Sequence, residues 1–145
     1  MYRKHKGKIE FLLLRSGSPF YKNQSKGIWT IPKGIMEENE DKKTAAKREF
    51  EEETGQKLTT ELIYLGEEKI RKGKIVIVHM TEGNLNVSTI KSNTFQLEYP
   101  KNSGRFCKFP EIKRGEWFTY EIAKEFIHPK LIIFLDKCIA LQNKK

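Results

Sequence analysis

The sequence has few of the features that mark secreted, membrane or disulfide-rich proteins. Only two of its 145 residues are cysteines, Cys107 and Cys138, which are too few for a disulfide framework and are not spaced like metal ligands. We interpret both as reduced thiols and expect a cytoplasmic protein. The longest apolar run, residues 75–80, is far shorter than the roughly 18 residues that a membrane helix needs, so we expect no membrane partner. The basic start, residues 1–6, is not followed by an apolar stretch, which argues against a secretory signal.

Arginine is scarce, although the chain is strongly basic. The net charge is +9, but only six of the 28 basic residues are arginines. A basic surface attracts phosphates without regard to sequence, whereas specific recognition of phosphates and bases favours the forked guanidinium of arginine. We therefore expect most lysines to solvate the surface. Nucleic acid is kept only as a less favoured partner, and nothing in the sequence indicates an oligomeric state.

The pattern of apolar runs predicts an α+β fold. A length of 145 residues with 37% hydrophobic content suits one domain spanning residues 1–145. Strands are expected at residues 9–14, 28–31, 62–65, 75–80, 85–87 and 95–99, and a late strand ends at 117–118 after a loop over 110–116. Helices are expected over residues 41–54, 120–126 and 129–142. This order favours a mixed sheet sandwiched between helices, an α/β/α arrangement.

The first predicted helix carries three glutamates on one face. Asp41 is a good N-cap, and Gly55 suits the left-handed position that ends a helix. Glu49, Glu52 and Glu53 stand at i, i+3 and i+4, so their like charges weaken the helix by about 0.2–0.5 kcal/mol per pair unless a cation lies among them. Mg²⁺ binds a few carboxylates and leaves its other positions to water and phosphate oxygens. The cluster therefore predicts a magnesium site, which Mn²⁺ could also fill; a merely solvated acidic face is the alternative.

A wider pattern surrounds these glutamates. Gly34 is followed after five residues by Glu40, and after seven more by Arg-Glu-Phe-Glu-Glu-Glu-Thr-Gly-Gln at residues 48–56. This resembles the Nudix box, in which Gly, five residues, Glu and seven residues precede Arg-Glu-apolar-any-Glu-Glu-any-Gly-apolar. Every charged and glycine position of the box is matched. Gln56 departs from it, because the family usually has an aliphatic residue there.

The resemblance extends along most of the chain. Residues 17–20, 92–100, 109–112 and 116–118 are similar to a bacterial branch of predicted nucleoside-triphosphate pyrophosphohydrolases. The family implies the Nudix fold and cleavage of a nucleoside diphosphate linked to another moiety. It normally opens with an apolar strand, of which little is present before residue 3. Either the first strand is short or the natural start lies upstream.

The resemblance also implies roles for single residues of the box. Glu49, Glu52 and Glu53 are the expected metal ligands, and the Gly34 carbonyl is a further expected ligand. Arg48, Glu40 and Gly55 are expected to be structural: the arginine by pairing with a box glutamate, Glu40 by supporting the loop and Gly55 by ending the helix.

A metal-activated water would attack one phosphorus, and a general base must lie within hydrogen-bond reach of that water. The family places the base either in the box or in a later loop. Glu111, six residues before Trp117, is our first choice, and Glu49 is close behind. Glu52 is counted with these two as catalytic, because it holds the cation that would stabilise the transition state.

Four further residues are candidates for binding substrate. Lys33 precedes the loop glycine and could bind a phosphate, although a solvated lysine is an equal alternative. Phe20, Tyr21 and Tyr120 could stack on a nucleobase, and packing into the core is the alternative for each.

Two functional hypotheses follow from these residues. The first is a magnesium-dependent pyrophosphohydrolase acting on a nucleoside triphosphate, a dinucleoside polyphosphate or a nucleotide sugar. The second is an RNA-end-directed or non-catalytic nucleic-acid-binding Nudix module. The intact set of glutamates favours hydrolysis, since a binding module gains nothing from clustered, repelling carboxylates.

Overall fold

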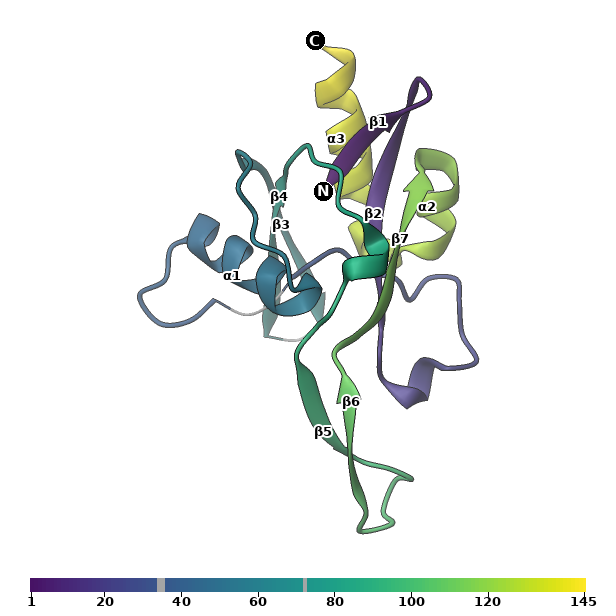
Figure 1. The fold of residues 1–145 in the computed structure, drawn as a ribbon. Helices are drawn as coiled ribbons and strands as arrows, with labels where there is room; N and C mark the ends of the chain where they lie inside the picture. The colour runs from purple at the N-terminus through teal and green to yellow at the C-terminus, as the bar shows by residue number, and fades with distance from the viewer. Residues whose placement is uncertain (34–35, 72) are drawn as a thin grey trace.

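Seven strands and three α-helices make up the fold in a computed structural model, which describes residues 1–33, 36–71 and 73–145 (Figure 1). The strands are β1 (Tyr2–His5), β2 (Lys8–Ser16), β3 (Ile63–Arg71), β4 (Lys74–Met80), β5 (Thr94–Glu98), β6 (Phe106–Pro110) and β7 (Ile112–Thr119). The α-helices are α1 (Lys42–Thr54), α2 (Tyr120–Phe126) and α3 (Ile132–Asn143), and short 3-10 turns form η1 (Pro19–Tyr21), η2 (Val87–Thr89) and η3 (Pro129–Leu131). None of the helices in the described parts of the chain is long and apolar enough to cross a membrane.

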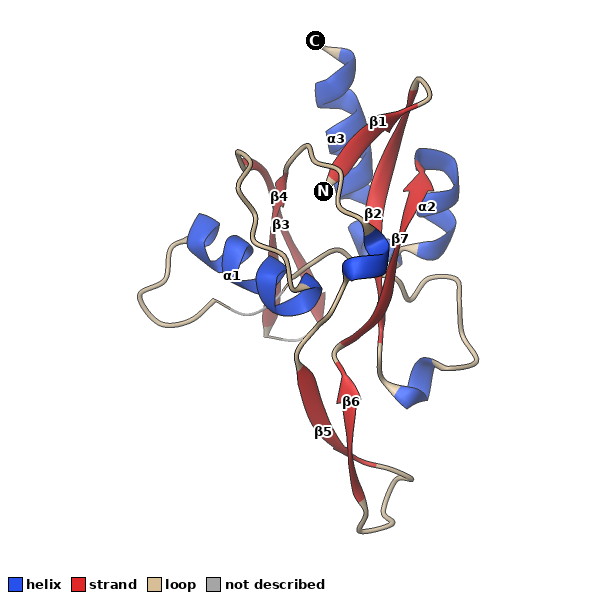
Figure 2. Ribbon diagram, in the orientation of Figure 1, coloured by secondary structure: helices blue, strands red, loops and turns tan. Residues whose placement is uncertain are grey.

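The strands pair antiparallel in three groups. β1, β2 and β7 form one sheet with β2 in the middle, β3 pairs with β4, and β5 pairs with β6. Isolated parallel bridges join Tyr2 to Glu82 and Trp29 to Ile127, so the strand arrangement is mixed. Figure 2 shows α1 on one side of the strands and α2 on the other. The predicted α+β class, with helices on both sides of the strands, is confirmed.

Strand β2 separates two apolar cores. Its residues Phe11, Leu12, Leu13 and Leu14 are all buried, and successive side chains of a strand point to opposite faces. Phe11 and Leu13 pack into the larger core, which includes residues of α2 and α3, whereas Leu12 and Leu14 pack with Phe50 of α1. Because both faces of β2 are covered, helix α1 is held on one side of the sheet and α2 and α3 on the other.

Two predicted helix boundaries agree closely with the structure. The Asp41 side chain accepts a hydrogen bond from the main-chain N–H of Thr44, so it is the N-cap of α1. Gly55 ends the helix at φ 78°, a left-handed conformation that costs glycine little. Helix α2 covers the predicted residues 120–126.

Three predicted segments differ from the structure. Residues 85–87 are not a strand: the Asn86 side chain accepts from Ser88 N–H and starts η2 instead. Residues 110–116 are not a loop, because β7 already begins at Ile112. Residues 28–31 contribute only single bridges, at Trp29 and Thr30. The first strand, which the sequence suggested could be short, is present as β1 and is four residues long.

Candidate active site

Glu53 is the most buried carboxyl group on α1. Glu53 is only 6% exposed, and its Oε1 accepts a hydrogen bond of 2.8 Å from the main-chain N–H of Lys33. Burial raises the pKa of Glu53 to about 8, against the opposing effects of that hydrogen bond and the Lys33 charge. The Glu53 carboxylate therefore lacks a cationic partner strong enough to offset its loss of solvent.

Arg48 is the central cation of the acidic face. Its Nε and Nη2 donate to the two carboxylate oxygens of Glu40 at 2.7 and 2.9 Å, a bidentate pair. Its Nη1 also donates to Glu49 at 2.8 Å and to Glu52 at 3.2 Å. The Glu40 hydrogen bonds hold the pKa of Arg48 well above its usual range and the pKa of Glu40 below its own. These contacts accord with the structural roles predicted for both residues.

Glu49 and Glu52 differ in exposure. The Glu49 side chain is 14% exposed and that of Glu52 is 37% exposed. Burial raises the pKa of Glu49, and the charges of Glu52 and Glu111 add to this rise while Arg48 opposes it. Helical spacing thus places the carboxylates on one side of α1, as predicted. The charge of Glu111 is close enough to raise the pKa of Glu49.

Hydrogen bonds of the main chain hold Glu111 beside this helix. The N–H of Asn93 donates to the carbonyl of Glu52 at 2.9 Å, and the N–H of Glu111 donates to the carbonyl of Asn93 at 2.8 Å. The N–H of Gly17 then donates to the Glu111 carbonyl at 3.0 Å. Burial and the Glu52 charge both raise the pKa of the Glu111 carboxyl group. The C-terminal half of α1, the start of β7 and the loop after β2 therefore meet at Glu111.

Comparison with known protein families identifies the family of this chain. A family model described as the NUDIX domain matches residues 1–138. The chain belongs to the NUDIX family. A search of curated proteins returned no match.

Solved structures share the Nudix fold across nearly the whole chain. A C. elegans Ap4A hydrolase, solved as a binary complex, is similar with a TM-score of 0.70 and 24% identity, covering 99% of this chain and 95% of that one. A second structure of C. elegans Ap4A hydrolase has a TM-score of 0.59 and 26% identity over 97% of this chain and 92% of its own. The E. coli ORF135 protein has a TM-score of 0.57 and 20% identity, over 99% of this chain and 88% of its own.

The donor set of the Nudix helix fits a divalent cation chemically. Glu49, Glu52 and Glu53 offer hard carboxylate oxygens, the ligands that Mg²⁺ and Mn²⁺ prefer. Burial without a full cationic partner at Glu53 is an imbalance that a divalent ion would correct. Within residues 1–33, 36–71 and 73–145, no three acidic, histidine or cysteine side chains are gathered on one point, since Arg48 draws Glu49 and Glu52 toward itself. The remaining predicted ligand, Gly34, lies outside the described residues.

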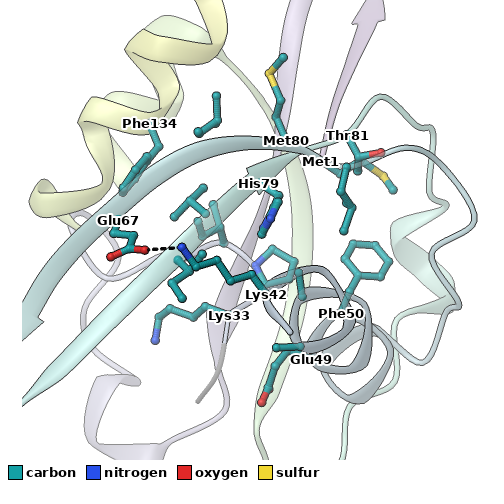
Figure 3. Close-up of a pocket in the computed structure, with 18 of the residues that line it drawn as sticks. Met1, Lys33, Lys42, Glu49, Phe50, Glu67, His79, Met80, Thr81 and Phe134 are labelled. Carbon is teal, nitrogen blue, oxygen red and sulfur yellow. Dashed lines mark hydrogen bonds and ion pairs between the residues drawn. The ribbon is translucent and has the colours of Figure 1, made fainter. Parts of the chain in front are cut away.

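A cavity of about 450 Å³ opens beside the acidic face (Figure 3). Apolar side chains from α1, β4 and α3, among them Phe50, Met80 and Phe134, form much of its wall. Lys33 and Glu49 line it as well, so it reaches one of the predicted catalytic residues. Figure 3 also shows the ion pair between Lys42 and Glu67, at 2.9 Å, among its lining residues. The cavity is large enough for a drug-sized ligand.

The predicted aromatic residues fall into two places. Phe20 and Tyr21 lie on η1 and are 51% and 42% exposed. Tyr120 lies at the start of α2, where its ring is near Phe11 and its hydroxyl group donates to Asp136. Of the contacts described for Tyr120, none joins it to the acidic face of α1, so its predicted role in binding substrate remains a prediction.

Two residues that position the site were not singled out from the sequence. Asn93 links α1 to Glu111 through its main chain, which leaves no signal in side-chain type. Arg15 is 8% exposed, and its Nη2 donates to the carbonyls of Tyr21 at 3.2 Å and Gln24 at 2.5 Å. An arginine that directly follows the apolar run 11–14 of β2 was the available sign that this side chain is buried.

Proposed function

We propose that this Nudix protein is a divalent-cation-dependent pyrophosphohydrolase, which cleaves a phosphoanhydride bond in a nucleoside diphosphate linked to another moiety. The observation that carries the proposal is that Glu111 lies close to the helix face that carries the three glutamates of the box. Glu111 is held by main-chain hydrogen bonds next to the helix that presents Glu49, Glu52 and Glu53. Carboxylate oxygens are the ligands that a divalent cation prefers, and a bound divalent cation would supply the charge stabilisation that phosphoanhydride hydrolysis needs.

The residues of this chain divide the work as follows. A divalent cation bound to Glu49, Glu52 and Glu53 would lower the pKa of the attacking water and offset the charge that builds on the phosphate oxygens. Glu111 would accept the proton of the attacking water; burial and the charge of Glu52 raise the pKa of its carboxyl group, which makes the carboxylate a stronger base. Glu49 is the second choice for the base. Arg48 and Glu40 fix the position of the helix face through their bidentate pair.

The cavity supplies a place for the organic end of the substrate. Its apolar wall suits the planar base of a nucleoside, and Lys33 at its edge is placed to attract a phosphate group. The similarity to a protein described as an Ap4A hydrolase supports keeping dinucleoside polyphosphates among the candidate substrates, beside nucleoside triphosphates and nucleotide sugars. The family and fold alone do not choose among these, since loops outside the box contact the leaving group.

We also propose that the chain acts as one domain over residues 1–145 in a reducing, cytoplasmic setting. Both cysteines are free, Cys107 exposed and Cys138 buried, which accords with this setting.

The test is release of phosphate products from a panel of nucleotides, with and without Mg²⁺, by the parent protein and two variants. Glu52→Gln removes a proposed ligand, whereas Glu51→Gln makes the same change at the exposed neighbouring position. We expect Mg²⁺-dependent turnover by the parent and by Glu51→Gln, and a loss of about 100-fold in Glu52→Gln.

Two results would count against hydrolysis. Equal rates in the Glu51→Gln and Glu52→Gln variants would remove Glu52 from the site. Turnover of no nucleotide in the panel, together with salt-sensitive binding of RNA, would favour the nucleic-acid-binding module instead.

A further inference from the structure

A row of four aromatic rings runs from η1 across the β5–β6 hairpin. Phe20 lies 5.8 Å from Tyr99, Tyr99 lies 5.9 Å from Phe109, and Phe109 lies 6.2 Å from Phe95, all measured between ring centroids. We call these four residues the aromatic shelf. In Figure 1 the hairpin projects away from the rest of the fold, so the shelf lies outside the two apolar cores.

Strand register gives the hairpin two different faces. Phe95 stands opposite Phe109, and Leu97 stands opposite Cys107, so these side chains share the face of the shelf. Phe106 stands opposite Glu98 and points to the other face, where it is 64% exposed. Two exposed phenylalanines can therefore be compared: Phe20 of η1, which is part of the shelf, and Phe106 of the hairpin, which lies on its other face.

The loop that carries Phe20 is fixed although Phe20 itself is half exposed. The buried Arg15 donates to carbonyl groups of this loop, at Tyr21 and Gln24. At the start of the loop, Gly17 passes so close to the hairpin that an added Cβ would lie 1.9 Å from the carbonyl oxygen of Pro110. These contacts order the main chain that carries Phe20, which lowers the entropy lost when a ligand stacks on its ring.

Phe109 of the shelf stands two residues before Glu111, the residue proposed as general base. Glu111 directly follows Pro110 of β6, and its carbonyl accepts the hydrogen bond from Gly17. The cavity lies along α1, where Glu49 lines it, and none of the shelf residues lines it. A substrate whose phosphates lie at the acidic face can therefore extend one end into the cavity and the other end toward the hairpin.

We propose that the aromatic shelf binds a second planar ring of the substrate, carried at the end of the phosphate chain that is remote from the cavity. This inference rests on the proposed hydrolase function and narrows the substrate class to nucleotides with a ring at both ends. Ring faces stack on aromatic side chains whatever the base, and the half-exposed Phe20 offers such a face. Lys22, whose Nζ lies 3.5 Å from the Tyr99 hydroxyl oxygen, adds positive charge beside the shelf, which suits an anionic phosphate chain.

The test is calorimetric titration, with Mg²⁺ present, of two methylene-bridged analogues that resist hydrolysis. One is the analogue of diadenosine tetraphosphate and the other is that of adenosine tetraphosphate, which lacks the second ring. We expect the parent to bind the two-ring analogue about tenfold more tightly. Phe20→Ala should abolish this preference, Phe20→Leu should reduce it, and Phe106→Ala should retain it.

Several outcomes would overturn the proposal that the aromatic shelf binds a second ring. They are binding of neither analogue by the parent, equal binding of both, and equal loss of preference in Phe20→Ala and Phe106→Ala. Sedimentation gives another: if the parent is a dimer that Phe20→Ala dissociates while the ring preference stays, the shelf is a contact between copies of the chain. Failure of hydrolysis is a separate result, because a ring preference that depends on Phe20 would stand without any turnover.

Discussion

Glu52 and Glu111 are joined through the main chain of one residue that lies between them, Asn93. The Asn93 N–H donates to the Glu52 carbonyl and the Asn93 carbonyl accepts from the Glu111 N–H, at 2.9 and 2.8 Å. Side chains can be exchanged without breaking these bonds. The distance between the Nudix helix and Glu111 is therefore set by the backbone, and substitutions at either glutamate test chemistry more than folding.

Replacing Glu111 by Gln separates its role from that of the metal ligands. We expect turnover to fall by about 100-fold or more, because the group that accepts a proton from water is lost. The affinity for Mn²⁺ should stay close to that of the parent, in contrast to Glu52→Gln, which should lower both. Glu116→Gln, on β7 and paired with Arg114, is the matched control and should turn over normally. A Glu111→Gln variant as active as the parent would show that Glu111 is not the general base and would favour Glu49 instead.

The bidentate contact between Arg48 and Glu40 should matter for stability. Lysine cannot reproduce two parallel hydrogen bonds to one carboxylate, so Arg48→Lys should lower the melting temperature, and Glu40→Gln should lower it too. Glu125→Gln breaks an exposed pair with Lys26, 3.7 Å long, and should leave the melting temperature unchanged. Thermal unfolding of the metal-free proteins checks this. Equal melting temperatures in all of these variants would show that the Arg48 contacts do not hold the helix face.

Gly17 should not tolerate a side chain. An Ala Cβ would lie 1.9 Å from the Pro110 carbonyl oxygen, and backbone atoms can relieve such a clash only by moving apart. We expect Gly17→Ala to lower the free energy of unfolding in urea by about 1–3 kcal/mol, as overpacking commonly does. Turnover should also fall, because the Gly17 N–H bonds to Glu111. Ser25→Ala, an exposed change in the same loop, is the control, and a Gly17→Ala variant as stable as this control would contradict the contact.

Cys138 should make the fold sensitive to alkaline pH. Burial raises the pKa of its thiol from 9.0 to about 11. Because the folded pKa lies above the unfolded one, the protonated thiol stabilises the fold fully below pH 9, and this contribution is lost as the pH rises through about 11. Urea unfolding across that window should show a steeper loss of stability in the parent than in Cys138→Ala, which cannot titrate. Equal slopes in the two proteins would mean that the thiol is solvated in the folded state.

The local signals of α1 were sufficient to predict it. Asp41 and Gly55 act at single positions, as a cap and as a left-handed stop, so the sequence alone marks both ends of the helix. The face that carries Glu49, Glu52 and Glu53 then follows from helical spacing. The contacts of Glu49 and Glu52 with Arg48 could be expected for the same reason, because all three residues lie within the box itself.

Segments whose structure depends on distant partners were not predictable in this way. The predicted loop over residues 110–116 contains Gly115, which is buried in β7, where an added Cβ would lie 2.4 Å from the Ile90 side chain. Strand β6 is short and is held by its pairing with β5, in which Phe95 stands opposite Phe109. Its own residues therefore gave no pattern that predicts a strand. The link from Glu52 through Asn93 to Glu111 involves only main-chain atoms. Such bonds depend on how the chain folds back, which neither spacing nor residue type reveals.

The central claim is that one divalent cation binds between the carboxylates of α1, with Glu111 nearby. The most direct measurement is a Mn²⁺ titration followed by the amide signals of the isotope-labelled protein, since this ion broadens the signals of nearby nuclei. We predict that broadening at low Mn²⁺ concentration is confined to residues around Glu49, Glu52, Glu53 and Glu111, and that it disappears in Glu52→Gln but persists in Glu51→Gln. Broadening spread over exposed acidic residues elsewhere, or equal in the two variants, would contradict the account.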